Sequence, residues 1–228
     1  MKVSWFKQIE LSSRCNLACP YCPHATMQRP KLDMSEETFA RVLVWLRHFV
    51  AFGDQELQGD LSLHGLGEST LHPGFVPLVR RIREVYPGVL ILSTNGTKLT
   101  METCAALREL GPVRVDVSLH QPARAVHGVM AAKMTGILGT ATSYAATDPM
   151  NWAGRVNWYS LPSDEPCPWL ETGGAAVCAD GRIVTCCLDA DGESTIGSVF
   201  LGPGLGQGAA LESKPWKACK TCHHTRYR

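Results

Sequence analysis

Residues 15–22 have the sequence Cys15-Asn-Leu-Ala-Cys19-Pro-Tyr-Cys22, which places three thiols on one short stretch of chain. This stretch closely follows a β-like run at residues 3–11. A loop with this spacing can wrap three corners of a cuboidal iron–sulfur cluster and leave the fourth iron open for another ligand. The alternative is a zinc site that His24 completes. The pattern therefore predicts a metal centre at the end of the first strand.

Strands alternate with amphipathic helices over the first 120 residues. Strands are expected at 3–11, 61–64, 89–93 and 113–119. Helices are expected from a capping pair, Asp33 and Glu36, to Gly53, then at 73–86, and from a Thr100 cap to Gly111. Residues 121–162 are expected to add one or two further units. Strict alternation predicts an α/β fold, either a right-handed parallel barrel or a partial (β/α)6 TIM-like barrel, with its chemistry at the carboxyl ends of the strands.

The composition changes after Pro162, where glycine, proline and cysteine become frequent. We therefore expect two domains, a barrel at residues 1–162 and a small loop-rich domain at residues 163–228. A hairpin is predicted at 175–177 and 183–185, with its turn at Asp180-Gly181. So small a segment usually needs a covalent or metal crosslink, and its cysteines favour a metal.

Charge and targeting signals limit the partners that we expect. The chain has 228 residues with 22 basic and 21 acidic side chains, a formal net charge of +1, and it has no basic run. Neither a nucleic acid nor a membrane surface is therefore an expected partner. Charged residues interrupt positions 1–14, so no secretory signal is predicted and a cytoplasmic location is expected. In a reducing compartment the ten cysteines favour metal or redox chemistry over structural disulfides.

The spacing of Cys15, Cys19 and Cys22 resembles that of the radical S-adenosylmethionine (radical SAM) superfamily. The resemblance implies a 4Fe-4S cluster held by these three thiolates. It also implies that the amine and carboxylate of S-adenosylmethionine (SAM) chelate the open iron.

Three strand-end motifs and one aromatic residue agree with this resemblance. Gly65-Leu-Gly67-Glu68 resembles the glycine-glycine-glutamate motif, whose glycines would let the backbone approach the methionyl group while the carboxylate holds its ammonium. The segment 93–96 is similar to the ribose-contacting segment, and 117–120 ends the fourth strand. Tyr21 matches the aromatic position beside the adenine. The cofactor-binding residues implied are Tyr21, Gly65, Gly67, Glu68, Ser93, Asn95, Ser118 and His120.

The C-terminal cysteines resemble the auxiliary-cluster (twitch) domain of the SPASM/twitch subgroup. The resemblance implies that four thiolates fully ligate a second 4Fe-4S cluster: Cys167, Cys186, Cys219 and Cys222. A structural zinc site held by the same thiolates is the alternative. Cys178 could replace Cys167, although its place inside the predicted hairpin makes it the poorer ligand.

Two further cysteines receive different interpretations. Cys104 lies in the third predicted helix and is expected to be a small buried hydrophobe. Cys187 follows Cys186, at the place where the sulfatase-maturing relatives carry the aspartate that acts as base on the substrate. The resemblance therefore places a catalytic thiol, a good hydrogen-atom donor, near the reacting carbon. Alternatively, Cys187 is a buried thiol or an alternative ligand.

The overall layout resembles radical SAM enzymes that tailor aminoglycosides and aminocyclitols, such as 2-deoxy-scyllo-inosamine dehydrogenases and related epimerases. The resemblance implies that a 5'-deoxyadenosyl radical takes hydrogen from a carbinol carbon of such a sugar, with a reductant such as flavodoxin or ferredoxin. Cys187 favours an epimerase, because the thiol can return hydrogen to the opposite face. The alternative is a dehydrogenase, in which the auxiliary cluster takes an electron and a ketone is left. Trp152 stands near the place of the dehydrogenase's substrate arginine.

Two other functions are compatible with parts of the pattern. A peptide-modifying maturase usually carries an added N-terminal peptide-binding domain, and a cluster motif that begins at residue 15 is expected to leave no room for one. An electron-transfer or zinc-binding module would require the glycine-glutamate motif and the strand-end motifs to be accidental.

Overall fold

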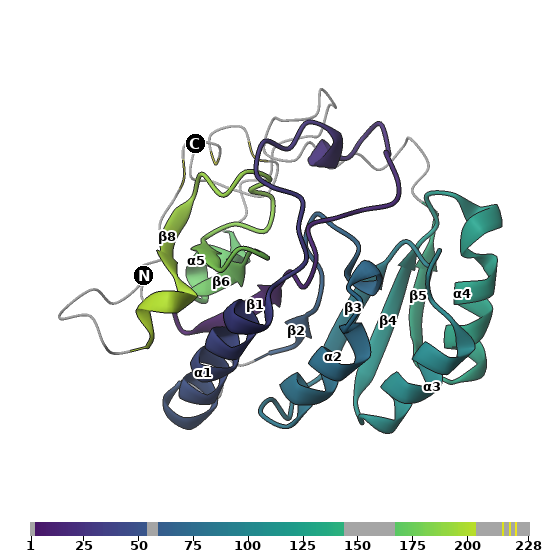
Figure 1. Cartoon of the computed structure of the whole chain (residues 1–228), viewed down its shortest axis with the longest axis horizontal. Coiled ribbons are helices and arrows are strands. Elements are labelled where there is room, and N and C mark those ends of the chain that lie inside the picture. Colours follow the sequence, from purple (N-terminus) through teal and green to yellow (C-terminus); the bar gives the residue numbers. More distant parts are fainter. Residues whose placement is uncertain are drawn as a thin grey trace.

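The computed structural model describes residues 3–53, 59–143 and 167–203 together with Trp216, Cys219 and Cys222. An eight-stranded sheet organises them, with the strand order β5-β4-β3-β2-β1-β6-β7-β8 (Figure 1). The strands are β1 (Trp5–Ile9), β2 (Leu61–Ser62), β3 (Leu90–Thr94), β4 (Val113–Ser118), β5 (Leu138–Thr142), β6 (Gly174–Val177), β7 (Arg182–Val184) and β8 (Thr195–Ser198). The predicted α/β class with a mainly parallel sheet is confirmed.

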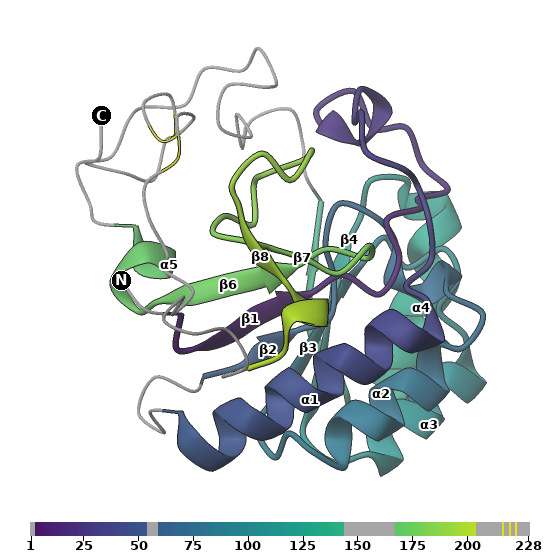
Figure 2. The same ribbon diagram turned by 60° about the vertical axis from the view of Figure 1, so that its left-hand side comes forward.

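Strands β1 to β5 run parallel, and a helix lies between each strand and the next. These helices are α1 (Glu36–Phe52), α2 (Phe75–Arg83), α3 (Met101–Glu109) and α4 (Pro122–Met134). All four cover the same face of the sheet (Figure 2). We call the opposite face the open face. Among the described helices, none combines the length and apolar character that crossing a membrane requires.

The core lies between this helical layer and the sheet. Phe6 of β1 packs against Trp45 and Phe49 of α1, with ring centroids 5.8 and 5.0 Å apart. Cys104 of α3 is 0% exposed in the same core, which confirms the expected small buried hydrophobe. Burial raises the pKa of its thiol to about 11.

Helix α1 begins two residues later than predicted. Its cap is Ser35, whose Oγ accepts a hydrogen bond from the backbone N–H of Thr38 at 3.1 Å. Asp33 has another role, because it accepts hydrogen bonds from Ser12 Oγ at 2.7 Å and Arg14 Nη1 at 2.9 Å. Ser12 and Asp33 also form an isolated antiparallel bridge. This pairing closes the base of the segment 13–32, which carries the three N-terminal cysteines and which we call the cysteine loop.

The sheet continues into the region predicted as a second domain. Strand β6 pairs in parallel with β1, so that Trp5 lies opposite Gly174 and Ile9 opposite Val177. Strands β6 and β7 form the predicted hairpin, with Gly181 in its turn at a φ of +87°. The predicted boundary at 162–163 lies outside the described residues. Residues 174–198 therefore extend the sheet beyond β1.

Short helical segments complete the described structure. They are α5 (Pro168–Glu171) and the 3-10 turns η1 (Pro23–Ala25), η2 (Ser69–Leu71) and η4 (Val199–Leu201). Turn η1 lies in the cysteine loop, and α5 immediately precedes β6. Helix α4 and strand β5 form one of the one or two units predicted for residues 121–162.

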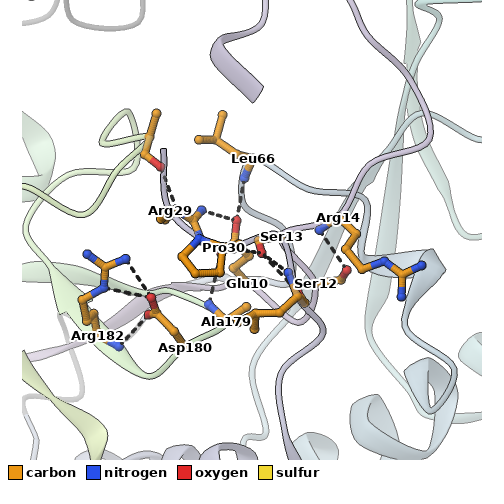
Figure 3. A network of polar contacts seen from close by, with 12 residues as sticks. Glu10, Ser12, Ser13, Arg14, Arg29, Pro30, Leu66, Ala179, Asp180 and Arg182 are labelled. Atoms are coloured by element: carbon orange, nitrogen blue, oxygen red, sulfur yellow. Dashed lines mark hydrogen bonds and ion pairs between the residues drawn. The ribbon is translucent and has the colours of Figure 1, made fainter. Parts of the chain in front are cut away.

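A buried ion pair joins the first strand to three other segments (Figure 3). Glu10, after β1, accepts hydrogen bonds from Arg29 Nη1 at 2.6 Å and Nη2 at 2.7 Å. The two side chains are 3% and 4% exposed. The carboxylate also accepts the backbone N–H of Leu66 at 3.0 Å and of Ala179 at 3.1 Å, and Arg29 Nε donates to the carbonyl of Ala190 at 2.7 Å. One carboxylate thus holds the cysteine loop, the loop after β2 and the hairpin turn together.

The replacement Glu10→Gln is expected to lower the free energy of unfolding by about 3–5 kcal/mol, because it leaves the buried charge of Arg29 uncompensated. Urea unfolding measures this loss. The matched control Glu36→Gln breaks an ion pair with Arg81 in which the Glu36 side chain is 70% exposed, and it should cost no more than about 1 kcal/mol. Equal losses in both variants would contradict the structural role of the buried pair.

Candidate functional site

The three N-terminal cysteines lie on the cysteine loop, beyond the carboxyl end of β1 (Figure 1). Their thiols lie close enough to influence one another: burial raises the pKa of Cys22 to about 11, and negative charge on Cys19 and Cys15 adds to the increase. Buried thiols need a nearby positive charge to ionise, which bound iron supplies. The amide of Asn95 also donates to Cys15 Sγ at 3.9 Å. Hydrogen-bonded thiolates of this kind suit an iron–sulfur cluster.

A single zinc ion fits the cysteine loop less well. Within residues 3–53 and 59–143 and the described C-terminal residues, no three His, Cys, Asp or Glu side chains are grouped closely enough to bind one metal ion. A cuboidal cluster instead takes each thiolate at a separate corner. His24, the predicted fourth zinc ligand, is buried, and its Nε2 hydrogen-bonds the carbonyl of Ser13 at 3.0 Å. Its observed contact is therefore with the base of the loop.

The loop after β2 passes so close to other backbone that two of its positions require glycine. A Cβ on Gly67 would lie 2.1 Å from the carbonyl oxygen of Ser12, and a Cβ on Gly65 would lie 2.5 Å from the side chain of Glu10. The sequence suggested that these glycines admit the methionyl group of SAM. The structure shows that glycine is already required at both positions because the loop packs closely against other parts of the chain.

Glu68 links the loop after β2 to the end of β3. Glu68 is 3% exposed, and its carboxylate accepts hydrogen bonds from Thr94 Oγ1 and from the backbone N–H of Asn95, both at 2.7 Å. It also accepts from the hydroxyl of Thr70 at 2.6 Å. Its expected contact with the ammonium of SAM stays a prediction. The contacts present in the structure position Asn95.

Asn95 in turn connects β3 to the cysteine loop. Its side-chain nitrogen donates to Asn16 Oδ1 at 3.0 Å as well as to Cys15. Its side-chain oxygen accepts from the backbone N–H of Thr97 at 3.0 Å. Glu68, Asn95 and Cys15 are therefore joined in one chain of contacts across the carboxyl ends of three strands.

Two other predicted SAM-binding residues lie in direct contact. Tyr21 Oη and His120 Nδ1 are 2.5 Å apart, and the ring centroids are 5.4 Å apart. Burial lowers the pKa of His120. Ser93 and Ser118 are half-buried on β3 and β4. Leu92 and Val117, which adjoin these serines in the two strands, belong to the core beneath the helices, so both serines lie on the open face.

The four C-terminal cysteines of the predicted auxiliary site also gather in one neighbourhood. Burial raises the pKa of Cys219, and negative charge on Cys186 and on Cys167 raises it further. Cys222 is 8% exposed and belongs to a small apolar group that includes Cys186 and Trp216.

Backbone N–H groups hydrogen-bond two of these sulfurs. The amide of Leu188 donates to Cys186 Sγ, and the amide of Trp216 donates to Cys219 Sγ, each at 3.3 Å. Such donors stabilise thiolate ligands. Cys178 has different surroundings, because it is 5% exposed and packs with Ala176, Val184 and Trp169. This apolar packing does not favour Cys178 as a replacement ligand.

Cys187 contacts Cys186 and lies beside the open face of the sheet. Its thiol hydrogen-bonds that of Cys186, which together with burial raises the pKa of Cys186. Cys187 also lines a cavity of about 10 Å³ whose wall includes Gln8 and Glu10 from the first strand segment and Ala176 from β6. A cavity of this size holds about one water molecule. The thiol is therefore next to the open face and not enclosed in the core.

One feature that the sequence indicated is not described by the structure, and one interaction in the structure was not predicted from the sequence. Residues 151–155, including Trp152, lie outside the described residues. The Glu10–Arg29 pair was missed, although one available signal was an acidic residue, Glu10, between the apolar residues Ile9 and Leu11. Arg29 carried no local signal, because its partner is 19 positions away.

Residues 9–136 match the radical SAM superfamily, and this stretch covers more than half of the chain. A tungsten-containing aldehyde ferredoxin oxidoreductase cofactor-modifying protein of Pyrococcus furiosus is 35% identical over 106 residues, which cover 45% of this chain and 27% of the relative. An S-adenosyl-L-methionine-dependent 2-deoxy-scyllo-inosamine dehydrogenase of Niallia circulans is 27% identical over 118 residues, 51% of this chain and 45% of the relative. The chain therefore spans less than half the length of either relative.

Solved structures show a similar fold. BtrN in complex with AdoMet and 2-DOIA matches with a TM-score of 0.70 and 23% identity, over 86% of this chain and 78% of BtrN. Tagged anSMEcpe with bound AdoMet matches with a TM-score of 0.59 and 15% identity, over 96% of this chain and 84% of that protein. At these identities the likeness concerns the fold. Through the match over residues 9–136, this chain belongs to the radical SAM superfamily, whose fold implies SAM and a 4Fe-4S cluster as cofactors.

Proposed function

We propose that this radical SAM enzyme removes a hydrogen atom from a carbinol carbon of an aminoglycoside- or aminocyclitol-type sugar and epimerises that carbon. Cys187 would be the hydrogen donor. The observation that carries the proposal is the position of Cys187, which lines a cavity with Gln8 and Glu10 beside the open face. When bound, SAM and two 4Fe-4S clusters supply an organic radical and a store for one electron.

Two sets of thiols would hold the clusters. Cys15, Cys19 and Cys22 would bind the cluster that takes SAM, and their number leaves one iron open. Cys167, Cys186, Cys219 and Cys222 would bind the auxiliary cluster. SAM would lie over the carboxyl ends of the strands, near Tyr21, Gly65, Gly67, Glu68, Ser93, Asn95, Ser118 and His120.

The thiol step balances as follows. The S–H bond of Cys187 breaks, and a C–H bond forms on the face of the sugar carbon opposite the one that lost its hydrogen. The sulfur is then one electron and one proton short of a thiol. An external one-electron donor of the flavodoxin or ferredoxin class supplies the electron, and solvent supplies the proton. The substrate is thus inverted without net oxidation.

A dehydrogenase is the second candidate, and the similarity to the Niallia circulans enzyme favours it. In this case the carbon radical loses one proton and one electron to leave a ketone, and the one-electron acceptor becomes reduced. Cys187 would then take no part in the reaction. A peptide-modifying maturase has weaker support, since the match to anSMEcpe at 15% identity concerns the fold.

Metal analysis tests the cofactor assignment. Anaerobically reconstituted protein is expected to contain about eight irons, and a Cys15→Ala/Cys19→Ala/Cys22→Ala variant about four, because each 4Fe-4S cluster has its own thiols. A Cys167→Ala/Cys186→Ala variant should likewise lose about four irons. A Cys104→Ala variant, which alters a core thiol, should keep the full content. Zinc with little iron would refute the assignment.

The variant Cys187→Ser is expected to abolish inversion while release of 5'-deoxyadenosine continues, because a hydroxyl is a much poorer hydrogen-atom donor than a thiol. Mass spectrometry and NMR of products made in D2O provide the measurement. The wild-type epimer should carry deuterium at the inverted carbon, since the S–H proton exchanges with solvent. Cys104→Ala is the matched control. An undiminished yield of epimer from Cys187→Ser would exclude the donor role, and a ketone from the wild type would favour the dehydrogenase.

A further inference from the structure

His64 follows β2 and lies on the open face. Its neighbours Leu61 and Leu63 are 0% and 1% exposed and belong to the core beneath the helices. Successive side chains of an extended segment point to opposite faces, so Ser62 and His64 point away from the helices.

Strand register places His64 in a row of polar residues that crosses the open face. Gln8 pairs with Ser62, and Ser62 pairs with Ile91. Two positions further along each segment, Ser93 pairs with Asp116 and Asp116 with Thr140. The electrostatic influence of Glu10 and Asp116 on the His64 ring agrees with this arrangement. The row comprises Glu10, His64, Ser93, Asp116 and Thr140.

The acidic members of this row already have partners. Glu10 binds Arg29, and Asp116 accepts hydrogen bonds from Thr140 at 3.1 Å and from Arg114 at 3.2 Å. By contrast, Nδ1 of His64 is buried and has no hydrogen-bond partner in the described part of the chain. Buried polar atoms are nearly always satisfied in folded proteins, so an unpaired one requires an explanation.

The charge state of the imidazole ring limits which chemical groups could pair with Nδ1. Burial lowers the pKa of His64 to about 4, despite the opposing effect of Asp116 and Glu10. The imidazole is therefore neutral near pH 7, and its Nδ1 either accepts or donates one hydrogen bond according to the tautomer. A hydroxyl group satisfies either tautomer, because it both donates and accepts. A neutral ring also avoids repelling the ammonium groups of an aminocyclitol.

We propose that Nδ1 of His64 binds a hydroxyl group of the substrate on the open face. The inference rests on the proposed function, since it assigns one contact to the sugar-type substrate of that reaction. His64 acts here as a binding and positioning residue. His64 follows the carboxyl end of β2, on the side of the sheet that the cavity lined by Cys187 adjoins.

Three substitutions distinguish the contribution of Nδ1 from that of Nε2. His64→Asn places a polar amide atom near the position of Nδ1, whereas His64→Gln places one near the position of Nε2. His64→Phe keeps a planar aromatic ring at this position but has neither nitrogen. Titration calorimetry of 2-deoxy-scyllo-inosamine and of the aminoglycoside neamine into anaerobically reconstituted, SAM-loaded protein provides the affinities.

For whichever of the two probes binds the wild type more tightly, we expect the affinity of the Phe and Gln variants to be roughly tenfold lower than that of the wild type. The affinity of the Asn variant should remain within about threefold of the wild-type value. SAM affinity should be unchanged in all three, which also shows that each variant is folded. Wild-type affinity in the Phe variant, or equal affinity in the Gln and Asn variants, would overturn the assignment of Nδ1 and leave the proposed function standing. Failure of both probes to bind the wild type would instead overturn the proposed substrate class, and the His64 contact with it.

Discussion

The buried pair of Glu10 and Arg29 is the interaction on which the arrangement of the site depends. Two charged groups that are almost fully buried require well-formed hydrogen bonds, and here the carboxylate accepts four while the guanidinium reaches a backbone carbonyl as well. The contacts reach the cysteine loop, the loop after β2 and the turn between β6 and β7. Movement of any one of these segments would leave a buried charge unsatisfied, so their relative positions are strongly constrained.

Residues at the strand ends likewise make contacts within the protein that hold the loops in place, independently of any ligand. Gly65 and Gly67 allow the loop after β2 to lie against Glu10 and Ser12. Glu68 fixes the end of β3, and Asn95 then reaches Cys15. The side chains that our proposal assigns to SAM are thus preorganised by contacts within the chain, which is an advantage for a site that must hold a reactive group in one position.

The parallel pairing of β6 with β1 places the hairpin that precedes Cys186 and Cys187 beside the strand that the N-terminal cysteines follow. The N-terminal group follows β1, and Cys186 and Cys187 follow the hairpin that β6 begins. The cavity that Cys187 lines therefore includes Gln8 and Glu10 from the first strand segment.

The sequence by itself determined the α/β class, the order of the first four strands, the hairpin and the two groups of cysteines. Each of these has a local signal, such as apolar periodicity, the Asp180-Gly181 turn or close cysteine spacing. Tertiary structure alone decided that Ser35 caps α1 while Asp33 closes the cysteine loop, that Arg29 meets Glu10, and that Nδ1 of His64 has no hydrogen-bond partner among the described residues. These outcomes depend on residues far apart in the chain, because burial and hydrogen-bond partners exist only after the segments have packed together.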